Sequence, residues 1–126
     1  MTLTDFLLAR IAEDEAVAIR LCPGRSPDNG HWIATSLEFS GVHDRPTTKH
    51  IVRHDPSRVL AECAAKRLIV AEHAPMPCEN ERHQHGLHCA VCEYDVISRG
   101  WHPCPTLRFL ALPYADHSDY LPEWRP

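Results

Sequence analysis

Residues 55–73 have the sequence DPSRVLAECAAKRLIVAEH, and this stretch decides the expected fold. Asp55 followed by Pro56 is a strong helix start, because an acidic N-cap accepts backbone N–H groups and proline suits the first helical position. Apolar side chains then recur at helical spacing on one expected face: Val59, Leu60, Cys63, Ala64, Leu68 and Ala71. An Ala-Pro-Met-Pro segment follows and ends the pattern. We therefore expect a helix over 56–72, with His73 at its C-terminal end.

Three further segments have helical signals. Residues 3–21 carry apolar side chains mostly on one stripe, and Thr2 with Asp5 forms a capping-box pattern at their start. Residues 46–53 and 105–112 are shorter predicted helices, and each begins with a proline. The sequence therefore predicts a mainly helical protein.

Two other segments complete the expected fold. Residues 31–39 alternate between apolar and polar side chains, as a strand does. The tail, residues 113–126, is expected to fold back as an aromatic lid through Tyr114, Tyr120 and Trp124. The predicted fold is a small α+β domain over residues 1–126, mainly helical, with a short β element and a zinc-ordered loop that joins two helices. Cys22 and Cys63 are expected to be small buried hydrophobes.

Length and composition limit the function classes. At 126 residues the chain suits one domain, and a formal charge of −4 with a pI near 6.2 argues against a mainly electrostatic nucleic-acid binder. No apolar run is long enough to span a membrane. The start, MTLTDFLLARIAEDE, lacks the basic leader of a signal peptide. We therefore expect a cytoplasmic protein with no membrane partner.

Histidine and cysteine are concentrated in one part of the chain. Between His73 and Cys104 lie 9 of the 16 His and Cys residues, in 32 of 126 positions, where an even distribution would place about four. Cytoplasmic proteins seldom keep disulfides, so this density favours metal or redox chemistry. The same stretch lacks any helical or strand periodicity, and a loop of such length needs something else to order it. A metal ion would do so.

The spacing of these residues favours a structural zinc site. Cys89-Ala-Val-Cys92 is a C-x2-C pair, which allows two thiolates from one tight turn to bind the same ion. The motifs of c-type haem attachment, zinc deaminases and H-E-x-x-H metalloproteases are incomplete or missing, and no βαβ pattern supports a thioredoxin-like site. Cys104 precedes a predicted helix, where the N-terminal dipole favours a thiolate.

The fourth ligand is less strongly specified by the sequence. His88 and His102 lie too close to neighbouring cysteines to share one tetrahedron easily, and His83 and His85 lie in a polar loop. His73 is instead held at a helix end. We predict one structural Zn²⁺ bound by His73, Cys89, Cys92 and Cys104, within a zinc-binding segment over 73–112. Cys78 in place of His73 is the main alternative, and His83, His85 and His88 are candidates for a second metal.

Several segments together resemble a known family. They are HIVRHDP at 50–56, VLAECAAKR at 59–67, PCPTLR at 103–108 and LALPYADH at 110–117. The chain resembles a family of small proteins of unknown function from actinobacteria and their bacteriophages, which share the HDP-initiated helix, the C-x2-C pair and the PCPTLR segment. The resemblance covers most of residues 1–21 and 46–126 and is weaker over 23–45, and it implies the same four metal ligands. It implies no activity.

The sequence leaves three hypotheses for function. The first is a zinc-stabilised, non-enzymatic binding module that engages a protein partner, as a phage or actinobacterial accessory protein in the bacterial cytoplasm. The second is a nucleic-acid binder that uses the basic face of residues 50–67. The third is a metal-dependent hydrolase or nuclease. No set of Asp, Glu and His has a recognisable catalytic spacing, so we assign no catalytic residues.

Overall fold

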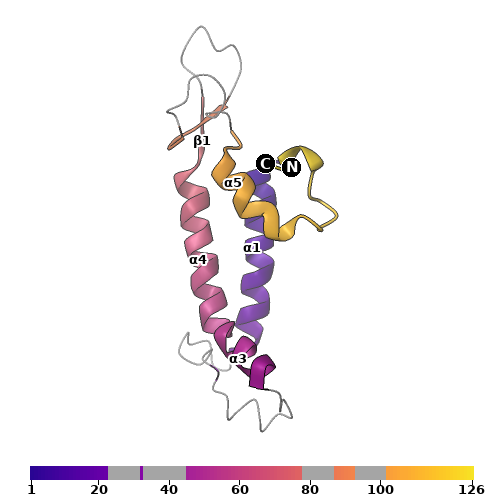
Figure 1. The fold of residues 1–126 in the computed structure, drawn as a ribbon. Helices are drawn as coiled ribbons and strands as arrows, with labels where there is room; N and C mark the ends of the chain where they lie inside the picture. Colours follow the sequence, from indigo (N-terminus) through magenta and orange to yellow (C-terminus); the bar gives the residue numbers. More distant parts are fainter. Residues whose placement is uncertain (23–31, 33–44, 78–86, 93–101) are drawn as a thin grey trace. The chain divides into compact units, whose positions relative to one another are not determined.

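The computed structural model describes residues 1–22, 32, 45–77, 87–92 and 102–126 (Figure 1). These residues form four α-helices, α1 (Leu3–Arg20), α3 (Arg45–Arg53), α4 (Pro56–Glu72) and α5 (Pro105–Ala111), and two strands, β1 (Pro75–Pro77) and β2 (Leu87–Cys89). Two short 3-10 helices follow, η2 (Leu112–Tyr114) and η3 (Pro122–Trp124). The protein is thus mainly helical with a short β element, as the sequence predicts, and this element is a two-stranded antiparallel sheet. Its position differs from the strand expected at 31–39. No helix among the described residues is long and apolar enough to cross a membrane.

The described chain divides into two compact units. The terminal unit contains Met1–Arg10 and Lys66–Pro126, and the central unit contains Ile11–Ala65. Both α1 and α4 contribute residues to each unit. The terminal unit holds both chain ends, the small sheet, α5 and the tail.

Two helix starts have the side-chain caps that the sequence predicts. Thr2 and Asp5 form the expected capping box: the Asp5 backbone N–H donates to Thr2 Oγ1 at 3.1 Å, and the Thr2 N–H donates to Asp5 Oδ2 at 3.0 Å. Asp55 is buried and caps α4, since its Oδ1 accepts the Arg58 N–H at 2.9 Å. Its Oδ2 accepts the Trp32 N–H at 3.4 Å. The Asp55-Pro56 start of α4 is confirmed.

The core of the terminal unit forms around the ring of Phe6, which is fully buried. The tail surrounds this ring, with centroid distances of 6.4 Å to Tyr114, 5.8 Å to Tyr120 and 5.1 Å to Trp124. Such offset and edge-to-face contacts add to the stabilisation that burial alone provides. The predicted aromatic lid is therefore confirmed, and it explains why the two chain ends are neighbours in Figure 1.

A buried cation lies beside this core. The Arg10 side chain is 9% exposed, donates to the imidazole of His117, and lies 3.8 Å from Asp119. Its guanidinium also lies 5.3 Å from the centroid of the Phe6 ring. Arg10 thus adds polar contacts between α1 and the tail, and these contacts fix the direction in which the tail returns.

Several expectations about single positions are wrong. Leu68 is 72% exposed, and Ala64 and Ala71 are exposed as well, so the apolar spacing on α4 does not mark a fully buried face. Cys63 is buried as expected, but Cys22 is half-exposed. The strand predicted at 31–39 lies outside the described residues, apart from Trp32.

The small sheet lies in the stretch where the sequence shows no periodicity. β1 and β2 are antiparallel, with Pro75 opposite Cys89, Met76 opposite His88 and Pro77 opposite Leu87. Strands of three residues are too short to produce a detectable alternation, and two of the three β1 residues are prolines, which are rare in strands. The sheet was therefore not predictable from periodicity.

Candidate metal centre

His73 lies at the point where α4 ends. Its backbone N–H donates to the Ile69 carbonyl at 3.1 Å, so the last helical turn includes His73 and fixes the direction of its side chain. The chain then turns into β1 at Pro75. The backbone of His73 is thus held by a helical hydrogen bond.

The small sheet brings the C-x2-C pair to the end of α4. Cys89 is the last residue of β2 and is paired with Pro75, two residues after His73. The Ala90 N–H then donates to the Ala74 carbonyl at 3.0 Å, which extends the pairing into the turn that carries Cys92. Antiparallel pairing thus converts a separation of 16 residues along the chain into direct contact between His73 and Cys89.

Cys104 joins the cluster from the start of α5. It is the N-cap residue of this helix, with an extended backbone at φ −72° and ψ 165°, and its side chain makes no capping hydrogen bond. The sulfur is therefore not used by the helix. Two residues earlier, the His102 N–H donates to the Leu87 carbonyl at 2.8 Å, which ties this segment to β2.

The four side chains form one compact group of donor atoms. The Nδ1 atom of His73 lies 3.2 Å from the sulfur of Cys89 and 3.5 Å from the sulfurs of both Cys92 and Cys104. All four donor atoms lie within 4.8 Å of one another, so the cluster could hold a metal ion. Cys89 and Cys104 are fully buried, and the other two residues are half-buried.

The ionisation of the thiols reflects this crowding. Burial favours the neutral form of Cys89, but N–H groups of Val91 and Cys92 and contacts with His73 and Cys104 lower its pKa from 9.0 to about 7. Burial and the neighbouring sulfurs of Cys89 and Cys104 raise the pKa of Cys92 to about 11. Three thiols packed together without a cation cannot all ionise easily, and a divalent ion reverses this effect. The donor set therefore fits a thiophilic metal.

The other candidate ligands named from the sequence do not join this group. Cys78, His83 and His85 lie outside the described residues. His88 is opposite Met76 in the sheet, and alternation along β2 places its side chain on the other face from Cys89. His102 instead has its Nε2 atom 3.5 Å from Thr4 Oγ1, and burial lowers its pKa.

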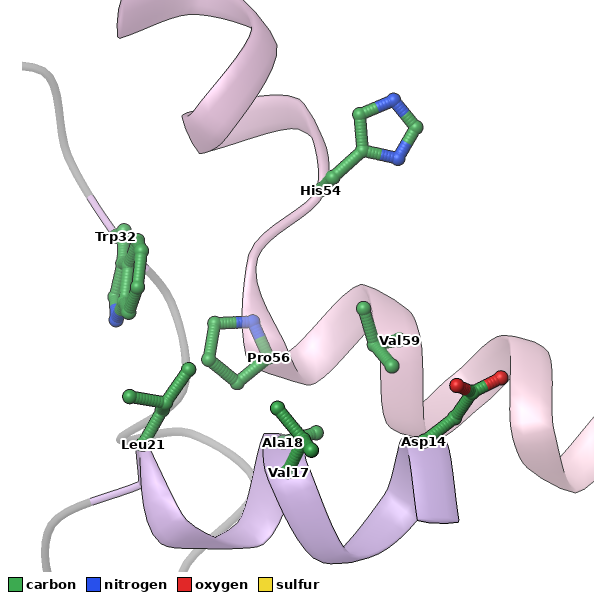
Figure 2. Close-up of a pocket in the computed structure, with 8 residues that line it drawn as sticks. All are labelled: Asp14, Val17, Ala18, Leu21, Trp32, His54, Pro56 and Val59. Carbon is green, nitrogen blue, oxygen red and sulfur yellow. The ribbon is translucent and has the colours of Figure 1, made fainter. Parts of the chain in front are cut away.

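The central unit contains a pocket that the sequence did not predict. The pocket has a volume of about 310 Å³ and is mostly apolar (Figure 2). It includes two exposed apolar side chains, Val17 of α1 at 54% and Leu21, which directly follows this helix, at 47%. The described residues that line the pocket are Asp14, Val17, Ala18, Leu21, Trp32, His54, Pro56 and Val59. No motif connects these positions, so the sequence held no signal for the pocket.

The fold and the cluster define a small, mainly helical protein with a His-Cys₃ group that could hold a metal ion. The chain belongs to the family of unknown function DUF6221, whose model matches residues 1–126. The predicted membership in a family of unknown function is therefore confirmed. No curated protein and no solved structure matches the chain.

Proposed function

We propose that this protein is a zinc-stabilised, non-enzymatic binding module, in which one structural Zn²⁺ is bound by His73, Cys89, Cys92 and Cys104. The observation that carries the proposal is the convergence of one nitrogen and three sulfurs within 4.8 Å. These donors come from three separate segments, namely the end of α4, the β2 turn and the start of α5.

The distances support zinc as the ion. In a tetrahedral site with Zn–S of about 2.3 Å and Zn–N of about 2.0–2.1 Å, the nitrogen and each sulfur lie about 3.5 Å apart. The three observed separations from His73 Nδ1 are 3.2, 3.5 and 3.5 Å. Thiolate-rich sites also favour zinc over the harder ions Mg²⁺ and Ca²⁺. When bound, the ion would supply cross-linking of the three segments.

The donor set supports a structural role and no enzymatic one. Catalytic zinc has three protein ligands in most enzymes and leaves a fourth position for water. In the proposed site, four protein donors would occupy all four positions of a tetrahedron. Three thiolates against one divalent ion give a net charge of about −1, which weakens the polarisation of a carbonyl or a phosphate. A metal-dependent hydrolase or nuclease therefore has less support than a binding module.

The surface of the terminal unit supports a protein partner. Its exposed large apolar side chains include Leu68 at 72%, Phe109 at 57%, Leu112 at 44% and Leu121 at 38%. Phe109 and Leu112 are three residues apart across the end of α5, so they share one side of this short helical segment. Exposed aromatic side chains are typical of protein interfaces. The family resemblance further supports a role as an actinobacterial or phage accessory protein in the bacterial cytoplasm.

The nucleic-acid hypothesis has one supporting observation. Helix α3 carries Arg45, Lys49 and Arg53, all exposed, and no acidic residue. Against it, Lys66 donates to the Tyr114 hydroxyl at 3.0 Å and Arg58 pairs with Glu62 at 2.7 Å, so two cations of the 50–67 face have intramolecular partners. We expect nucleic-acid affinity no tighter than about 10⁻⁴–10⁻⁶ M at physiological salt. A nanomolar, sequence-dependent gel shift would reverse the order of these two hypotheses.

Two measurements on the purified full-length protein test the proposal. Native mass spectrometry should give one zinc per chain, and X-ray absorption at the zinc edge should give three sulfurs and one nitrogen without a water oxygen. A bound water in the first coordination shell would favour the hydrolase. A photo-cross-linking residue at Phe109 should capture one specific cytoplasmic protein, whereas the same residue at the exposed position Glu72 should not. Failure of the Phe109 cross-link, or equal capture from both positions, would refute the partner surface.

A further inference from the structure

A second cluster of metal-ligating groups lies in the central unit, apart from the cysteines. His50 is in α3 and His54 follows directly after this helix. The His54 N–H donates to the His50 carbonyl at 3.1 Å, so the helical turn continues and the two residues are one turn apart. Residues four apart in this geometry project from the same side of the helix. The two imidazoles are accordingly neighbours, with ring centroids 4.7 Å apart.

This separation between the ring centroids is compatible with one shared metal ion. For a bond of about 2.0–2.1 Å from the ion to an imidazole nitrogen, the ring centroid lies about 3.2 Å from the ion. Two such rings at a ligand angle between about 90° and about 110° then have centroids about 4.5–5.2 Å apart. The observed 4.7 Å falls inside this interval, and the ring planes are inclined by 43°.

The two rings are also accessible. Both residues are exposed, and neither ring has a hydrogen-bond or ion-pair partner among the residues that the structure describes. Figure 2 shows the His54 ring extending away from the other side chains of the pocket. The backbone behind it is held by the neighbouring Asp55, whose carboxylate accepts the Arg58 and Trp32 N–H groups. His54 is thus an exposed ligand on an anchored segment.

We propose that His50 and His54 form an exchangeable site for a divalent transition metal that prefers imidazole, such as Ni²⁺, Cu²⁺ or Zn²⁺. Two protein ligands leave the remaining coordination positions to water or to an external group. The exposed cations Lys49 and Arg53 flank the site, and their repulsion lowers its affinity. The site is therefore distinct from a structural centre, and it does not depend on the proposed zinc at the cysteines.

Calorimetric titration with Ni²⁺ tests the proposal, because Ni²⁺ does not oxidise thiols as Cu²⁺ does. The protein is first loaded with one equivalent of zinc at pH 7.5 and freed of weakly bound ions, so that the cysteine cluster is filled and the histidine pair is empty before nickel is added. We expect one nickel per chain. His50→Ala and His54→Ala should each weaken nickel binding by at least about tenfold, since either variant removes half of the chelating pair. Both side chains are exposed, so unchanged circular dichroism should show that the variants fold.

Two control variants make the result decisive. Lys49→Ala removes a positive charge beside His50 without removing a ligand, so it should not weaken nickel binding. A triple variant with alanine at His83, His85 and His88 tests the other histidine group, and it should bind nickel as the wild type does. Loss of binding in the triple variant with retention in His50→Ala would overturn the proposal. The same holds if the zinc-loaded wild type binds no nickel.

Discussion

Replacing Cys104 with serine tests whether this residue is a zinc ligand or only a small buried group at a helix start. The two roles predict opposite changes in the free energy of unfolding. Cys104 is the N-cap of α5, and its sulfur makes no capping hydrogen bond. Serine is among the preferred N-cap residues, and a good cap contributes about 1 kcal/mol. If the thiol were only a small buried group at a helix start, Cys104→Ser would be nearly neutral or slightly stabilising. If the thiol binds zinc, the same change removes one of four ligands.

The size of the second effect follows from the position of the site. The Cys104 sulfur is fully buried and lies 3.5 Å from His73 Nδ1, so no water can replace it without opening the cluster. Apparent binding free energies of structural zinc are about 10–16 kcal/mol, whereas whole domains are stable by only about 5–15 kcal/mol. Loss of the ion should therefore unfold at least residues 73–112. A gain of about 1 kcal/mol from the new cap cannot offset this.

The assay combines metal content with thermal unfolding. Cys104→Ser should contain less than one zinc per chain and should lose its cooperative unfolding transition, as the wild type does after exhaustive chelation. Cys22→Ser is the matched control, because the half-exposed Cys22 thiol donates to the Ala18 carbonyl at 3.3 Å and a hydroxyl can do the same. This control should keep its zinc and its Tm. If Cys104→Ser keeps full zinc content and an equal or higher Tm, the ligand set is wrong.

Three further predictions concern acid, the tail and the start of α4. Protons compete with the metal for His73 and the thiolates, so zinc should be released as the pH falls toward about 5, together with unfolding followed by circular dichroism; zinc still bound at pH 4 would contradict this. Trp124→Ala should lower the free energy of unfolding by about 3–5 kcal/mol in urea titrations, because Trp124 is buried against Phe6, while Trp124→Phe should lose less. Asp55→Ala should cost about 0.5–2 kcal/mol through the lost cap, and Asp55→Asn should recover most of it; equal losses would show that the cap is not responsible.

Local signals in the sequence determined the helices. Asp55-Pro56 and the Thr2–Asp5 pair define helix starts through bonds between residues at most three apart, and the structure shows these bonds. The family and the density of His and Cys in 73–104 are likewise properties of the sequence. All four proposed zinc ligands were named from spacing and from the rigidity of a helix end. The helix starts are predictable because capping depends on neighbouring residues, whereas the assignment of the four residues as zinc ligands stays a prediction.

Only the tertiary structure decided how these parts meet. Pairing of Pro75 with Cys89 brings His73 to the C-x2-C turn, and three-residue strands leave no periodic trace from which this register could be predicted. The sequence also did not predict which apolar side chains are exposed. Leu68 is apolar and has helical spacing, yet its side chain is 72% exposed. Helical spacing does not determine which neighbouring elements cover a helix face. The burial of Arg10 beside Phe6 and His117 depends on the return of a tail more than 100 residues away in sequence. Contacts between distant segments are set by packing of the whole chain, and no local pattern encodes them.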